Sequence, residues 1–121
     1  MTVIAGEALH LWQHAFHEQD VDALVDLYTA EALFLGSQPT LLRGSEGIHD
    51  YFTAVFTSGE VRVTFENLEV EHIADDVFLL AVRAIFSSPS RGELEMRLTQ
   101  TLLLRDGRWR IACHHASPAG R

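Results

Sequence analysis

Two adjacent histidines, His114 and His115, lie in the segment RDGRWRIACHHASP near the C-terminus. Histidine is the side chain that most readily exchanges a proton near neutral pH. The segment reads as a β-strand, and neighbouring side chains on a strand point to opposite faces of the sheet. The two imidazoles are therefore expected to face opposite ways, so that only one of them can contribute to a given site.

Three further histidines, His10, His14 and His17, are spaced so that one helix face could present them to zinc. On a helical wheel they lie opposite Trp12 and Phe16, and no nearby cysteine or aspartate completes a ligand set. A solvated helix face is the better interpretation. No metal site is predicted, and no phosphate-binding loop or nucleotide motif suggests a cofactor.

The order of the secondary-structure elements predicts an α+β domain. Apolar residues recur at helical spacing over residues 4–18, after the N-cap Asp20, and over residues 45–56. The segment EALFLG reads as a short strand, and SQPTLLRG reads as a loop. After Gly59 the sequence alternates through four long strands, the last two joined by the Asp-Gly turn of RDG. Three N-terminal helices packed on a curved, mainly antiparallel sheet are expected.

Length and charge narrow the classes of function. The 121 residues suit a single domain over residues 1–121, and the formal charge of −8 opposes binding to nucleic acid or to an acidic membrane surface. The start of the chain lacks the features of a signal peptide, and the longest apolar run, VFLLAV, is too short to cross a membrane. Cys113 is the sole cysteine, which suits a reducing compartment. A soluble, cytoplasmic protein is expected.

Both ends of the chain resemble a known family. DVDALVDLYTAEALFLGS with LRGSEGIHDYF resembles the start of SnoaL-like domains, and RLTQTLLLRDGRWRIACHHAS resembles their end. The last strand is also similar to that of the calcium/calmodulin-dependent kinase II association domain, in which His115 and Ser117 would match a histidine and a serine. The resemblance implies an NTF2-like cone fold, an apolar pocket for a small molecule and a homodimer formed by the opposite sheet face.

Ketosteroid isomerase shares this fold, but its catalytic residues have no counterparts in the sequence. That enzyme moves a proton with an aspartate base and holds the enolate oxygen with a tyrosine and a protonated aspartate. Alignment on the family places Gly36, Trp12 and Thr99 at these three positions. Glycine cannot accept a proton, so steroid-isomerase chemistry is not expected.

The resemblance nevertheless implies a site. It directs Arg97 and Thr99 toward the helices, with Arg83 in the pocket and His114 as the inward histidine. We expect Arg83 and Arg97 to bind the carboxylate or enolate oxygen of a small organic ligand, with His114 as acid and base. Such a protein could be an isomerase, dehydratase or cyclase that needs no cofactor. The residues expected to line the pocket are Trp12, Phe16, Tyr28, Phe34, Phe56 and Thr99.

Two structural alternatives and one functional alternative stay open. His114 could be a hydrogen-bonded core residue, and Arg83 and Arg97 could form cross-strand ion pairs with Glu66, Glu93 or Glu95. The functional alternative is a non-catalytic ligand-binding or oligomerisation module like the kinase association domain.

Overall fold

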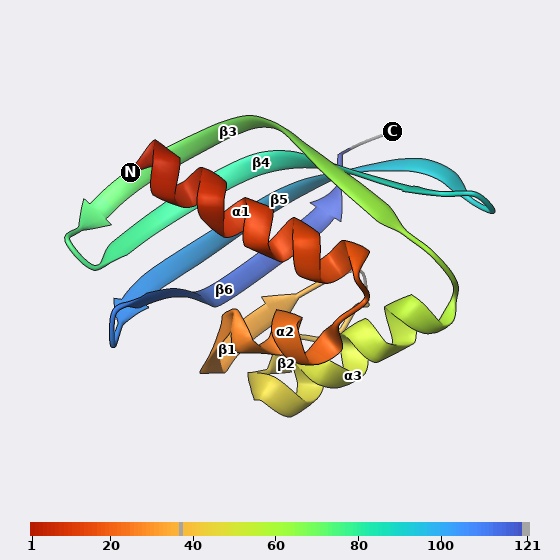
Figure 1. Cartoon of the computed structure of the whole chain (residues 1–121), viewed down its shortest axis with the longest axis horizontal. Helices are drawn as coiled ribbons and strands as arrows, with labels where there is room; N and C mark the ends of the chain where they lie inside the picture. The colour runs from red at the N-terminus through yellow and green to blue at the C-terminus, as the bar shows by residue number, and fades with distance from the viewer. Residues whose placement is uncertain (37, 120–121) are drawn as a thin grey trace.

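The computed structural model describes residues 1–36 and 38–119, and it confirms the predicted α+β fold (Figure 1). The helices are α1 (Thr2–His17), α2 (Val21–Asp26) and α3 (Gly44–Thr57). The strands are β1 (Tyr28–Leu35), β2 (Leu42–Arg43), β3 (Arg62–Ala74), β4 (Val77–Ser88), β5 (Gly92–Arg105) and β6 (Arg108–Pro118). They form one sheet in the order β2-β1-β6-β5-β4-β3, antiparallel except where β1 runs parallel to β6.

Helix α1 lies across the concave face of the sheet (Figure 1). Its buried residues, Ala5, Leu9, Trp12, Ala15 and Phe16, recur every three or four positions and so form one stripe. The predicted N-cap of α2 is confirmed, because the Asp20 carboxylate accepts a hydrogen bond from the Ala23 amide at 3.1 Å. Within the described ranges, no helix combines the length and apolar character that crossing a membrane requires.

The predicted orientation of β5 is wrong. Its buried residues are Met96, Leu98, Gln100 and Leu102, whereas Arg97 and Thr99 are exposed on the other face. The physical reason is a bulge in β6, where the pairing passes from Thr101–Cys113 to Leu102–Ile111 and leaves Ala112 as an extra residue. Because of this extra residue, the inward His114 lies opposite Gln100 and not opposite Thr99. The bulge shifts the alternation of β6 by one position. Counting back from the hairpin therefore assigned Ile111 to the outer face, yet it is buried.

Helix α1 also protects the free edge of the sheet. Strand β3 is an edge strand, and the backbone of its Val63 contacts two side chains of α1. The Val63 amide donates to His17 Nε2 at 2.9 Å, and Gln13 Nε2 donates to the Val63 carbonyl at 2.8 Å. His10 and His14 are exposed as predicted, but His17 is half-buried. These side chains occupy edge groups that could otherwise pair with another strand.

Candidate functional site

A chain of buried polar groups crosses the apolar core. The Trp12 indole donates to the Tyr28 hydroxyl at 2.9 Å, and this hydroxyl lies 3.1 Å from Nδ1 of His114. The Gln100 amide nitrogen lies 3.1 Å from the same Nδ1. Besides Trp12 and Tyr28, the buried polar residues in the described part of the chain are Gln100 and His114. A polar network inside an apolar core holds its members in fixed positions.

Neighbouring strands bring these residues together. Gln100 of β5 lies directly opposite His114 of β6, and Phe34 of β1 lies opposite His114 on its other side. The Phe34 ring stacks on the imidazole with ring centroids 4.4 Å apart and planes 12° apart. Trp12 reaches the imidazole from α1, with ring centroids 6.1 Å apart. The ring of His114 therefore packs against two aromatic rings.

The hydrogen bonds determine where the imidazole carries its proton. An indole N–H can only donate, so the Tyr28 oxygen accepts from Trp12, and the same hydroxyl also contacts His114 Nδ1. The Gln100 amide donates to the same atom. Nδ1 is thus an acceptor, and the ring proton of the neutral imidazole lies on Nε2. Both of these contacts of the imidazole are made by Nδ1.

Burial keeps the site uncharged. Removal from water, with a smaller contribution from the charge of His115, lowers the pKa of His114 to about 3. Burial also raises the pKa of the Tyr28 phenol, although its hydrogen bond with Trp12 opposes that change. The predicted inward orientation of His114 is confirmed by its burial. At pH 7 its ring is neutral, so it offers a hydrogen-bond donor rather than an imidazolium acid.

The two arginines do not join this site, and the prediction that they line the pocket is wrong. Arg83 alternates with the buried Val82 and Ala84 and therefore points to the outer face of the sheet. Its Nε lies 2.7 Å from Glu95 Oε2, and its second contact is Glu66, at 3.5 Å. The alternative of a cross-strand ion pair is thus confirmed for Arg83.

Arg97 lies directly opposite Arg83 on the same outer face. Its guanidinium lies 3.4 Å from the Ser117 hydroxyl of β6. Thr99 and His115 share that face and are exposed. The outer face therefore carries Arg97 and Thr99, which the sequence assigned to the pocket, and it also carries the second histidine, as predicted.

The predicted aromatic residues meet in one cluster. Trp12, Phe16, Tyr28 and Phe34 are buried, whereas Phe56 is half-buried. The rings touch, as shown by centroid separations of 4.9 Å for Trp12–Phe16 and 5.2 Å for Phe16–Phe56. Phe52, which was expected in the core but not among the pocket-lining residues, packs against Trp12, Phe16 and Phe34. Side chains thus fill the space around His114.

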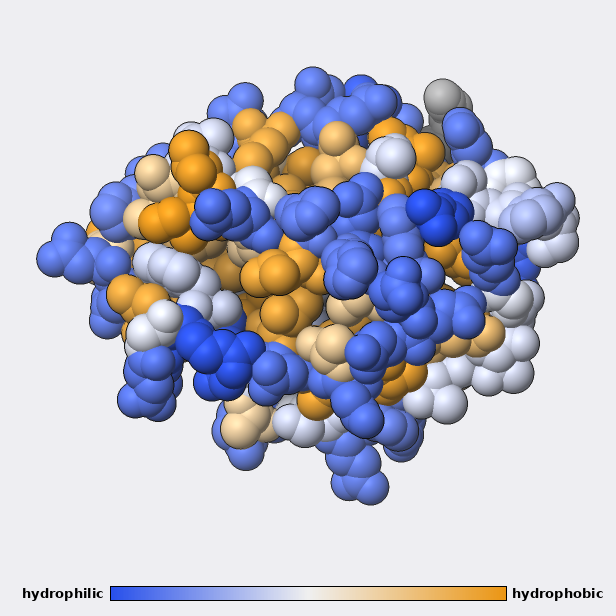
Figure 2. All heavy atoms as spheres, in the orientation of Figure 1, coloured by the Kyte–Doolittle hydropathy of each residue, from blue (hydrophilic) through white to orange (hydrophobic). Residues whose placement is uncertain are grey.

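A groove of about 360 Å³ lies between α1 and β3, next to this cluster. Its lining residues are Gly6, Leu9, His10, Gln13, Phe65, Glu66, Asn67, Leu68 and Val82. Phe65 lines the groove and also contacts Trp12, with ring centroids 6.2 Å apart. Strand β3 is irregular here, because a bulge lies between Glu66 and Glu69 and Asn67 has a φ of 60°. Apolar side chains show on both sides of the polar ridge of α1 (Figure 2).

Gly36 lies at the position where the resemblance placed a catalytic aspartate, and it has no room for a side chain. A Cβ there would lie 2.7 Å from Phe34 Cε1 and 2.8 Å from Tyr51 Cζ. We expect Gly36→Ala to lower the free energy of unfolding by about 1–3 kcal/mol, because two packed rings must shift. Urea unfolding measures this change.

The control for Gly36 is Gly6 of α1, where a Cβ would have no heavy atom within 4 Å among the described residues. Gly6→Ala should raise the free energy of unfolding by about 0.5–1 kcal/mol, since alanine favours a helix interior over glycine. A Gly36→Ala protein as stable as the native chain would show that Phe34 and Tyr51 are loosely packed.

Comparison with known proteins gives a family and a fold. The sequence profile of the SnoaL-like domain family matches residues 6–120 of this chain. No curated protein matches the chain at a significant level.

Several solved structures share the fold at low sequence identity. A candidate calcium/calmodulin-dependent protein kinase II association domain from Xanthomonas campestris is 20% identical, with a TM-score of 0.85 over 97% of this chain and 86% of that one. A candidate dehydratase of the NTF2-like family from Streptomyces avermitilis is 14% identical, with a TM-score of 0.85 over 97% and 94%. An uncharacterised cystatin-like protein from Caulobacter vibrioides is 17% identical, with a TM-score of 0.85 over 98% and 89%.

Proposed function

The chain belongs to the SnoaL-like domain family, and we propose that it binds a small, largely apolar molecule through a carbonyl or enol oxygen at His114 Nε2. The observation that carries this proposal is the buried, neutral imidazole whose Nδ1 is contacted by Tyr28 and Gln100, so that the ring proton lies on Nε2. In an apolar core such a donor forms a stronger hydrogen bond with a ligand oxygen than it would in water.

The chemistry of the surroundings favours a neutral ligand. The described residues place no carboxylate and no guanidinium in the core, so a free carboxylate would be buried there without a counter-ion. The stacked rings of Phe34 and Trp12 suit a flat, apolar ligand. An aryl ketone, a phenol or a quinone has both properties. This proposal replaces the anionic ligand expected from the sequence, because Arg83 and Arg97 lie on the other face of the sheet.

A hydrogen bond to a ketone oxygen also polarises the carbonyl group. A neutral imidazole N–H in a dry site can stabilise the negative charge that develops on this oxygen when a neighbouring C–H bond loses its proton. Isomerisation, dehydration and cyclisation of a carbonyl compound all pass through such an enolate. The described core holds no carboxylate base, so the proton would have to leave to a basic group of the ligand or to water.

The groove between α1 and β3 offers a route to the site. Its floor includes Val82, two positions from Leu80, which lies directly opposite Gln100. Residues so placed on one sheet face are close neighbours. Phe65 lines the groove and contacts Trp12, and the nearby bulge at Asn67 interrupts the hydrogen bonds between β3 and β4. We infer that movement of Phe65 opens the path to His114.

The test uses 1-tetralone, a bicyclic aryl ketone, as the probe and the ¹⁵N–¹H signal of His114 as the readout. We expect saturable binding and a downfield shift of the Nε2 proton. His114→Phe keeps an aromatic ring without the donor and should weaken binding at least tenfold, the scale of a lost hydrogen bond. His115→Ala and Arg83→Met alter the outer face and should leave the affinity unchanged. Equal affinity in the native and His114→Phe proteins would contradict the proposal.

The same probe separates an enzyme from a binding module. Exchange of the α-protons of 1-tetralone in deuterated water should be faster with the native protein than with His114→Phe if the site stabilises an enolate. Binding with no added exchange would favour the non-catalytic alternative. The expected homodimer stays a prediction, which the mass of the protein in solution would test.

A further inference from the structure

A second hollow lies on the other side of α1, between this helix and the start of β6. It has a volume of about 210 Å³. Its apolar wall is formed by Ile4, Ala8 and Leu11 of α1 together with Leu102, Trp109 and Ile111 of the sheet. Leu11 is 56% exposed, so apolar surface continues to the rim. Figure 2 shows apolar side chains in the region between α1 and β6.

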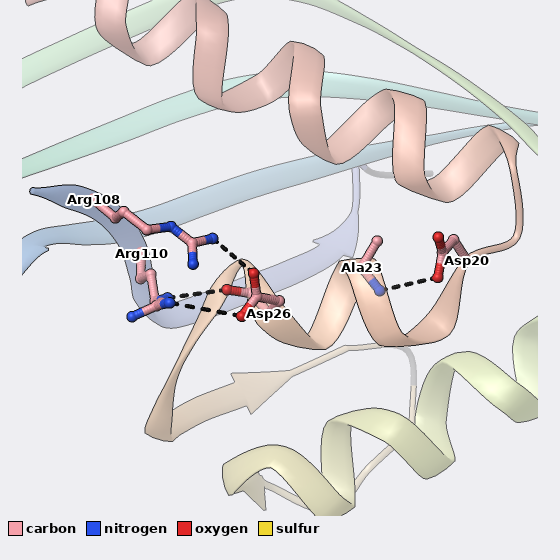
Figure 3. A network of polar contacts seen from close by, with 5 residues as sticks. All are labelled: Asp20, Ala23, Asp26, Arg108 and Arg110. Carbon is pink, nitrogen blue, oxygen red and sulfur yellow. Dashed lines mark hydrogen bonds and ion pairs between the residues drawn. The ribbon is translucent and has the colours of Figure 1, made fainter.

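Two charged residues of opposite sign border this hollow, Glu7 from α1 and Arg108 from β6. Arg108 is fixed in place, because its guanidinium lies 2.7 Å from Oδ2 of Asp26 at the end of α2 (Figure 3). Arg110 supports the same aspartate, donating to its backbone carbonyl at 3.1 Å. The Arg108 hydrogen bond holds the pKa of the Asp26 carboxyl below its ordinary value. The described contacts of Arg108 use one nitrogen, so further N–H groups remain for a ligand.

The charges around the hollow define the head group of its ligand. Glu7 and Asp26 would repel an anion, and the net charge of −8 would add to that repulsion. Arg108 and Arg110 would repel a cation. A neutral hydroxyl or amide avoids both costs, since it can donate to Glu7 and accept from Arg108.

The volume defines the length of the tail. Each water-sized or methylene-sized group occupies roughly 30 Å³, so the hollow accommodates about seven such groups. We propose that the hollow between α1 and β6 binds a neutral amphiphile with a chain of about six carbons, its tail on Trp109 and Ile111 and its hydroxyl between Glu7 and Arg108. This site shares no residue with the His114 network, and α1 separates it from the groove beside β3.

The probe is 1-hexanol, added to the full chain while ¹⁵N–¹H spectra are recorded. We expect saturable binding with a dissociation constant on the order of 1 mM, as is usual for so small a ligand. The indole N–H signal of Trp109 should move, whereas the signals of Trp12 and His114 should not. Shifts confined to His114 and Trp12 would overturn this proposal while leaving the proposed function intact, and absence of saturable binding would overturn it as well.

Two pairs of variants locate the ligand. Ala8→Leu fills the hollow and should weaken 1-hexanol binding roughly tenfold or more. Ala54→Leu makes the same change on an exposed position of α3 and should leave binding unchanged. Arg108→Gln should weaken binding, and Arg105→Gln, at an exposed position of the same hairpin, should not. Hexanoate and hexylamine should bind at least tenfold more weakly than 1-hexanol. Equal binding by Ala8→Leu, or tighter binding of hexanoate, would overturn the proposal.

Discussion

Lowering the pH from 7 to 5 is expected to reduce the free energy of unfolding by about 2 kcal/mol, mainly through His114. Burial lowers the pKa of this side chain to about 3 in the folded protein, whereas the unfolded chain has the ordinary value of 6.5. Between these values the unfolded state binds a proton that the folded state does not. The stability is therefore fully present above pH 6.5 and falls by about 1.4 kcal/mol per pH unit down to about pH 3.

His17 acts in the same direction. Its pKa is also lowered, first by burial and then by the charge of Arg62, although the Val63 carbonyl, 3.1 Å from His17 Nε2, opposes this change. Asp26 contributes in a different range. The pKa of its carboxyl is below the ordinary value of 3.8. The stability that its ionised form contributes to the fold is therefore lost only at more acidic pH. The loss between pH 7 and pH 5 thus comes from histidines.

Urea unfolding at pH 7 and at pH 5 measures this loss, and two neighbouring histidines provide the variant and its control. His114→Phe removes the titrating group and should reduce the difference between the two pH values by most of the 2 kcal/mol expected for the native protein, about the amount that this pKa difference contributes. His115→Ala removes an exposed imidazole and should leave the difference nearly unchanged. The same pH dependence in the native and His114→Phe proteins would show that His114 is protonated in the fold.

The sequence was sufficient for the fold because the two periodicities are clear. Helix α1 carries its apolar residues on one stripe, and α3 does the same with Ile48 and Phe52. The change to alternation after Gly59 predicted the four long strands. Only the boundaries differ, since β1 begins at Tyr28 rather than at the predicted EALFLG, and the loop after it includes the two-residue strand β2.

The faces of the strands were harder to predict. Strand β4 reads VFLLAVRAIFSS, and it is apolar on both faces, because Leu79, Ala81 and Ile85 alternate with the buried residues. Its pattern therefore does not determine where Arg83 points. In β5 the pattern was informative, since Met96 and Leu98 each lie between two polar residues and share a face with Gln100. The faces were instead assigned by counting residues from the hairpin and taking His114 and Thr99 to lie on the same face. The bulge at Ala112 made that assignment wrong by one position.

Gln100 is the main residue that the sequence analysis missed. A glutamine between two threonines has no helical or metal-binding pattern that would single it out. Its importance comes from its position directly opposite His114 on the neighbouring strand β6. That position depends on the register of the hairpin. The hydrogen bonds of Trp12 and Tyr28 depend in the same way on how α1 crosses the sheet. Such contacts between distant segments leave no periodic signal in one sequence.

Replacing Phe34 by alanine is expected to lower the free energy of unfolding by about 3–5 kcal/mol. Phe34 is 1% exposed and packs on His114, on Tyr51 with ring centroids 4.8 Å apart and on Phe52 at 5.6 Å. Removal of the ring leaves a cavity that three aromatic neighbours cannot close without shifting. Phe56→Ala, at a half-buried position of α3, should cost less. Urea unfolding compares the two variants, and Phe34→Leu serves in their place if Phe34→Ala does not fold.

The cavity in Phe34→Ala also tests what His114 can bind. An apolar cavity of this kind admits a small aromatic molecule, and a ligand at ten times its dissociation constant raises the free energy of unfolding by about 1.4 kcal/mol. Phenol and benzene fill similar space, but only phenol has an oxygen that can accept the Nε2 proton. We therefore expect phenol to stabilise Phe34→Ala more than benzene does, and neither to stabilise Phe56→Ala. Equal stabilisation by the two would mean that the imidazole gives no hydrogen bond to a ligand, and His114 would then be a structural residue of the core.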